Sequence, residues 1–205
     1  MQASTTDVLM APKPNSVRQT ANTSAQADPL QQACLLVGRF QYHFGRIEQK
    51  IDQGVIKLFD LDDKAGPIVT GSVDFAKKLN LVRTAASQQA RNKNDRKFGE
   101  DTCKGVFDIN DVRQLVIHSS FEPAPTGGVQ FKRTVAKDGR VRVYDQVWGE
   151  KDFNDQYAKM RRLAADLDKL VDVIKPVPTG GPGQINWVTL NSLVRIDPVS
   201  KKPDR

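Results

Sequence analysis

Apolar residues recur every three or four positions over several long stretches of the chain, and this spacing predicts amphipathic helices. The first predicted helix covers about residues 31–61, where Asp28 and Pro29 supply a cap and a first-turn proline. Its apolar stripe consists of Leu36, Phe40, Phe44, Ile47, Ile51, Val55 and Leu58. The pattern therefore places one long helix with a single apolar face at the start of the ordered region.

Three more helices follow from the same spacing. A turn-rich connection at 61–71 contains Gly66 and Pro67, and a second helix opens at Ser72. A third is predicted at about 94–119, with a break allowed near its middle at Gly105. A last long helix runs from a cap at Asp152 to about residue 175, before the prolines at 176 and 178.

Between the third and last helices the period changes from that of a helix to that of a strand. Two β-prone runs, at about 129–135 and 140–147, flank Asp138-Gly139. Asp-Gly between two such runs is a strong signal for a tight hairpin. A lone two-stranded hairpin is marginal in water, so it should lie against the helices or against a second subunit.

These elements predict a mainly α fold, an antiparallel four-helix bundle with a β-hairpin inserted before the last long helix. The bundle is expected at 30–176. Residues 1–29 have the composition of a disordered N-terminal tail. Residues 177–205 form a Gly/Pro-containing C-terminal tail, in which 185–193 is apolar enough to dock.

Composition limits which partners and which cellular compartment are expected. The formal charge of +7 favours acidic partners, nucleic acid first, although it also serves ordinary solubility. Cys34 and Cys103 do not make a disulfide framework, and each is expected to be a small buried hydrophobe in a reduced compartment. The sequence shows no membrane-spanning run and no export signal, so a cytoplasmic protein without a membrane partner is expected.

One constellation could carry chemistry. Phosphate loops, nucleophile elbows and helical zinc pairs are absent from the sequence, but Arg113 and His118 give Arg-x4-His near the end of the third helix. Histidine can shuttle a proton to or from a ribose hydroxyl, while arginine holds the scissile phosphate. Gln114 lies one turn from His118, but Arg113 lies about 140° away. A break in the helix, or a second copy in a symmetric dimer, could bring the two together.

This segment resembles the signature of the HEPN superfamily (higher eukaryotes and prokaryotes nucleotide-binding), in which Arg is followed by four to six residues and His. Gln114 departs from the Asn, Asp or His that usually follows the arginine. The resemblance implies a dimeric helical bundle, in many members a metal-independent RNase of toxin–antitoxin, defence or RNA-processing systems. In one subgroup a first helix carries Glu in a setting like that of Glu48, and a hairpin follows the Arg/His helix. No metal and no cofactor are implied.

Each of these residues also has a structural interpretation. His118 could cap the end of its helix, and Arg113 could pair with Asp111 or another carboxylate. Glu48 could belong to a solvated helix face. The second histidine, His43, is expected to be a buried or interface residue.

The hairpin is a second candidate feature because basic residues cluster on it. Cations contact phosphates and aromatic rings stack on bases, so the hairpin could bind RNA. Charged strand edges also serve simply to prevent aggregation. The basic residues are Lys132, Arg133, Lys137, Arg140 and Arg142.

The leading hypothesis is a homodimeric HEPN-like protein that cleaves or binds RNA in defence or stress response. His118 would be the general acid/base, Arg113 the phosphate ligand, and Gln114 would orient the site. The alternative is a non-catalytic helical module that binds a protein partner or forms a scaffold. Arg113 and His118 meeting in an open cleft across a two-fold axis would favour the enzyme, and full pairing with carboxylates would favour the scaffold. The sequence names neither an RNA target nor a cognate partner.

Overall fold

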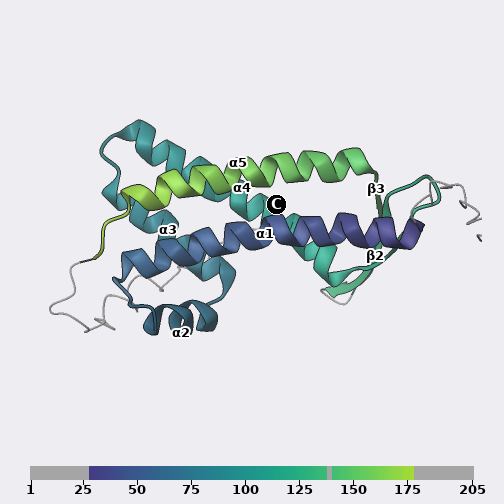
Figure 1. Ribbon diagram of the computed structural model, residues 1–205, viewed down its shortest axis with the longest axis horizontal. Coiled ribbons are helices and arrows are strands. Elements are labelled where there is room, and N and C mark those ends of the chain that lie inside the picture. The colour runs from purple at the N-terminus through teal and green to yellow at the C-terminus, as the bar shows by residue number, and fades with distance from the viewer. Residues whose placement is uncertain (1–27, 138–139, 178–205) are drawn as a thin grey trace, which may run out of the picture.

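The computed structural model describes residues 28–137 and 140–177 and is mainly helical, with a small three-stranded antiparallel sheet (Figure 1). The expected tails, apart from the residues next to the helical region, lie outside the described residues. The mainly α class is confirmed. The elements in chain order are α1 (Pro29–Leu58), α2 (Ala65–Ser72), α3 (Phe75–Gln89), α4 (Lys93–His118), β1 (Ser120–Pro123), β2 (Val129–Lys137), β3 (Arg140–Trp148) and α5 (Glu150–Val173).

Helix α1 forms where the apolar period predicts it. The Asp28 carboxylate accepts a hydrogen bond from the backbone N–H of Leu30 at 3.2 Å, and Pro29 occupies the first turn. Every member of the predicted stripe, from Leu36 to Leu58, is buried. The stripe thus fixes which face of α1 meets the other helices.

Helices α1 and α5 lie side by side and run in the same direction (Figure 1). The Tyr157 hydroxyl donates to the carbonyl of Leu36 at 2.6 Å, and the Lys57 ammonium donates to the carbonyl of Val171 at 2.9 Å. Residue numbers rise together along both helices, which is the signature of parallel packing. The expectation of an antiparallel arrangement is wrong for this pair, because the sheet returns the chain to the end where α1 begins.

Helix α4 runs in the opposite direction and is continuous over 26 residues, so the break allowed near Gly105 is not present. It approaches α5 closely at two glycines. A methyl group at Gly105 would lie 2.7 Å from Leu163 Cδ2, and one at Gly99 would lie 3.4 Å from Leu170 Cδ1. These two small residues let the helix backbones approach closely.

The sheet contains the predicted hairpin and one strand that the sequence did not predict. Helix α4 ends at His118, and β1 follows after one residue to pair with β2. A turn with positive φ at Gly127 and Gly128 joins β1 to β2. A Cβ at Gly128 would lie 2.1 Å from the carbonyl oxygen of Trp148, so only glycine fits there.

The connection at 61–71 was expected to be a turn, and this is wrong for most of its length. Helix α2 occupies it, with Gly66 and Pro67 in its first turn, where a proline needs no N–H donor. Helix α3 then begins at Phe75, after an N-cap at Asp74, rather than at Ser72. Helix α2 lies against α1 on the side away from α5 (Figure 1).

An aromatic cluster joins the sheet to the helices. Trp148, at the end of β3, has ring centroids 5.3 Å from Phe131 of β2 and 5.2 Å from Phe153 of α5. Phe40 of α1 lies 6.2 Å from Trp148, and Tyr157 lies 6.1 Å from Phe153. All five rings are at most 6% exposed. The cluster therefore fixes the base of the hairpin between α1 and α5.

The outer part of the hairpin leaves the body of the molecule. Strand β3 forms one edge of the sheet, and its residues 140–147 are exposed on both faces. Val141 and Val143 are 70% and 72% exposed. The hairpin thus rests on the helices only at its base.

Phe153→Ala should lower the free energy of unfolding by about 3–5 kcal/mol, because it removes a fully buried ring from the centre of the cluster. Urea denaturation followed by far-ultraviolet circular dichroism measures this change. Tyr144→Ala, on the exposed part of β3, is the matched control and should cost less than about 1 kcal/mol. Equal losses in both variants would contradict the anchoring role of the cluster.

Burial raises the pKa of the Tyr157 phenol from its ordinary value of 10.0 to about 12. The folded protein therefore keeps this proton while the unfolded chain releases it, so stability falls as pH rises from 10 toward 12. Tyr157→Phe should be less stable by about 1 kcal/mol at neutral pH, because a hydrogen bond is lost. The free energy of unfolding of this variant should fall less above pH 10 than that of the native chain. Parallel curves of unfolding free energy against pH would refute the raised pKa of Tyr157.

Candidate functional site

Arg113 lies in the last part of α4 and turns toward α1. Its guanidinium carbon lies 4.9 Å from the centroid of the Phe44 ring, and Nη2 lies 3.7 Å from Oε1 of Glu48. The side chain is 25% exposed. Its Nε is buried and has no hydrogen-bond partner among the described residues. Arg113 is therefore positioned by a ring and a carboxylate but keeps a free donor.

Glu48 is brought to Arg113, as the supporting role predicted for it requires. Within the described part of the chain, Arg113 pairs with Glu48 and not with Asp111. A separation of 3.7 Å is an ion pair but exceeds the range of a good hydrogen bond. With both groups partly exposed to water, the attraction between them is weak.

His118 is the last residue of α4 and is exposed. Its side chain forms no hydrogen bond or ion pair with any other described residue. A cation at this position is favoured by the helix dipole, as the capping interpretation requires. Because α4 is continuous, His118 lies about 140° around the axis from Arg113. The two side chains do not converge within one copy of the chain.

Gln114 is half-buried, and its backbone takes part in the contact between α4 and the sheet. Nη1 of Arg133, on β2, donates to the carbonyl of Gln114 at 3.2 Å. This bond adds a cation to the C-terminal turns of α4. Arg133, predicted as a nucleic-acid ligand, is thus partly occupied in joining the hairpin to the helix.

The other hairpin cations differ in their surroundings. Lys132 pairs with Glu122 of β1 at 3.0 Å. Arg140 and Arg142 are exposed on β3. Lys137 ends β2, and its side chain is outside the described set. The basic surface expected on the hairpin is therefore concentrated toward its outer half.

His118 lies beside the middle of β2, where the outer half of the hairpin begins. Ser120, two residues further on, pairs with Lys132 in the register of β1 and β2, and its hydroxyl donates to the Lys132 carbonyl at 3.1 Å. The outer, basic half of the strand pair thus extends away from the helix end that carries the histidine. A polyanion bound along this outer half would reach His118 where that half begins.

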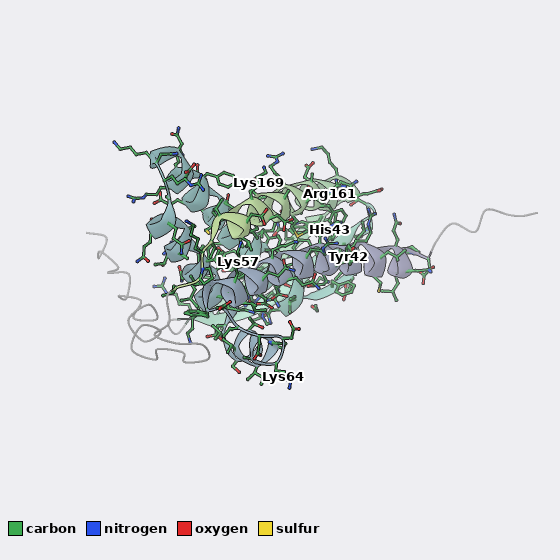
Figure 2. The ribbon with its side chains drawn as sticks, turned by 60° about the vertical axis from the view of Figure 1, so that its left-hand side comes forward. Tyr42, His43, Lys57, Lys64, Arg161 and Lys169 are labelled. Atoms are coloured by element: carbon green, nitrogen blue, oxygen red, sulfur yellow. The ribbon has the colours of Figure 1, made fainter. Side chains whose placement is uncertain are left out.

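A second cluster, which the sequence interpretation missed, lies on another face of α1. His43 is half-buried and lines a cleft between α1 and α5 together with Tyr42, Arg46 and Arg161. Figure 2 shows Tyr42 and His43 on the same side of the molecule as Arg161. Arg39 and Arg46, one turn before and after His43, were the available sequence signal. Arg161 reaches this cleft from α5 only through tertiary packing, which the sequence pattern did not show.

The described residues contain no group of three or more His, Cys, Asp or Glu side chains arranged to hold a metal ion. None of the described helices is both long enough and apolar enough to span a membrane. The two cysteines differ, since Cys103 is buried but Cys34 is exposed, contrary to expectation.

Comparisons with protein-family models, with curated proteins and with solved structures found no match to this chain. The candidate site is therefore interpreted from its own residues and geometry.

The Glu48–Arg113 pair should contribute little to stability. A double-mutant cycle with Glu48→Gln and Arg113→Gln should give a coupling energy below about 1 kcal/mol in urea denaturation. The exposed pair Lys104–Asp108, with atoms 3.1 Å apart, is the reference cycle and should give a similarly small value. A coupling of several kcal/mol would mean that the ion pair is a structural element.

Proposed function

We propose that this chain is a HEPN-like protein that acts on RNA as a metal-independent endoribonuclease, with its long helices forming a four-helix bundle of that type. The observation that carries the proposal is the placement of Arg113 and His118. The arginine is positioned by Glu48 and Phe44 with its Nε unpaired, while the histidine is exposed where α4 meets the basic hairpin.

The chemistry assigns one role to each residue. Neutral His118 would remove the proton from a ribose 2′-hydroxyl, and the imidazolium would then protonate the leaving 5′-oxygen. Arg113 would hold the phosphate and offset the charge that develops on its oxygens. Glu48 would orient the guanidinium, and Gln114 would contact the ribose. The cleavage would leave a 2′,3′-cyclic phosphate and a 5′-hydroxyl.

A second copy of the chain would complete the site. Arg113 and His118 diverge on one continuous helix, so a complete site requires these residues from two helices. A two-fold axis beside the end of α4 would place His118 of each copy close to His118 and Arg113 of the other. The proposed active form is therefore a homodimer.

The hairpin would guide the RNA. Exposed Arg140 and Arg142 would contact phosphates on the outer half, and the strand pair would lead the chain toward His118. A basic protein that cuts RNA without a metal ion would suit a cytoplasmic role in defence or stress response, as in a toxin–antitoxin pair.

A protein-interaction or scaffold role is the second candidate, and two observations favour it. Arg113 is already paired with a carboxylate, and within the described ranges β3 is an edge strand with two exposed valines, Val141 and Val143. Exposed strand edges commonly accept another strand. In this case His118 would serve only to stabilise the C-terminal end of α4.

The deciding experiment is cleavage of labelled RNA in the presence of EDTA. The native chain should cut, whereas His118→Ala and Arg113→Ala should each lose at least about a hundredfold in rate, the usual contribution of a general acid/base or charge-stabilising group. The product termini identify the chemistry. Asp111→Asn, on the same helical segment, is the matched control and should retain activity.

Oligomer size and circular dichroism must be unchanged in the variants for the loss to count. If several RNA substrates remain intact with a folded native dimer, the ribonuclease assignment is wrong. RNA binding that persists in His118→Ala but weakens steeply with salt and with Arg140→Gln/Arg142→Gln would instead indicate binding without cleavage.

A further inference from the structure

The cleft between α1 and α5 is separate from the Arg113 site. His43 lies five positions before Glu48 on α1, so the two side chains project about 140° apart around the helix axis. The cleft has a volume of about 310 Å³, in the range of small-molecule sites. Its lining consists of Tyr42, His43, Arg46, Met160, Arg161, Ala164, Ala165 and Asp168.

Positive charge converges on this cleft from both helices. Arg46 on α1 and Arg161 on α5 are exposed at its rim, and Arg39 lies one turn before His43 with its guanidinium 5.0 Å from the Tyr157 ring. Among the described residues, none of the three arginines forms an ion pair. The cluster thus contains exposed arginines that have no carboxylate partner among the described residues.

The single carboxylate in the lining does not neutralise this charge. Asp168 is held by Lys50 of α1 at 2.6 Å, so its charge is already balanced. Burial lowers the pKa of His43, and the charges of Arg161, Arg39 and Arg46 lower it further. His43 therefore lies near three positive charges that form no ion pair within the described part of the chain.

An aromatic surface borders the arginines. Tyr42 is 63% exposed, and its ring lies 5.4 Å from the His43 ring at an interplanar angle of 70°. An exposed tyrosine beside free guanidinium groups can contact a flat ring while the cations hold an attached anion. Arginine is suited to this task because its planar donors match two phosphate oxygens.

We propose that this cleft binds a small ligand that carries a phosphate group on a flat ring system, of which a nucleoside monophosphate is the simplest. Arg46 and Arg161 hold the phosphate from opposite walls, and Tyr42 contacts the ring. Met160 and the two alanines form the apolar floor. The inference does not depend on the ribonuclease proposal, because it uses none of Arg113, Gln114, His118 or Glu48.

The test is titration of the full chain with AMP, adenosine and inorganic phosphate at matched ionic strength, followed by NMR of the histidine rings. AMP should bind and shift the His43 signals, raising the pKa of that ring because the bound anion offsets the three arginines. Adenosine should not bind measurably.

Arg46→Gln and Arg161→Gln should each weaken AMP binding by about tenfold or more, the usual effect of losing a charged hydrogen bond. Arg162→Gln, the neighbouring exposed residue on α5 outside the lining, should have no effect. Tyr42→Ala should weaken AMP binding and leave phosphate binding unchanged. The RNA cleavage assay reports on the Arg113 site and the His43 signals report on this cleft, so the two outcomes are distinguishable.

Equal AMP affinity in the native chain and in the Arg46→Gln/Arg161→Gln double variant would overturn the proposal. So would the absence of both AMP and phosphate binding at low salt. A short RNA that binds through Arg46 and Arg161 when AMP does not would overturn the assignment to a small ligand.

Discussion

The packing of Trp148 between the sheet and two helices is the contact on which the arrangement depends. Its ring touches Phe131 of β2, Phe153 of α5 and Phe40 of α1, so one side chain links three elements. This contact holds the base of the hairpin at the end where α1 and α5 begin. It thereby sets the parallel course of these helices and the position of the hairpin beside His118.

Both candidate sites depend on how α1 distributes its residues around its axis. The side with Glu48 is turned to α4 and receives Arg113, whereas the side with His43 and Arg46 is turned to α5 and receives Arg161. The buried stripe between these sides fixes their directions. One helix thus supplies polar groups to two separate candidate sites.

The long helices and the hairpin could be predicted because their signals are local. The buried positions of α1 follow the apolar period, and Asp138-Gly139 lies between the two strands that it predicts. Strand β1 could not be recognised, since its four residues are too short a run for alternation to be distinctive, include Pro123, and gain their order from pairing with β2. Helix α2 was missed because Gly66-Pro67 is as typical of a turn as of a first helical turn.

The candidate site, too, could be predicted only where its signal is local in the sequence. The chemistry of Arg113 and His118 and the support from Glu48 were proposed from residue types and spacing, and the structure brings Arg113 to Glu48. Sequence could not show that Arg133 would contact the Gln114 carbonyl, because that bond depends on how the sheet meets α4. The cleft at His43 could not be predicted either, because Arg161 comes from a helix more than 100 positions away.

The parallel pairing of α1 with α5 has a consequence for how the chain folds. The bond between Leu36 and Tyr157 joins residues 121 positions apart, whereas the three strands follow one another directly. Closing so large a loop costs chain entropy, and contacts of long sequence separation slow folding. During synthesis α1 is made first, yet its apolar stripe meets α5 only after that helix has left the ribosome. Among the described helices, α1 is thus synthesised first and waits for the last one, α5, to complete its packing.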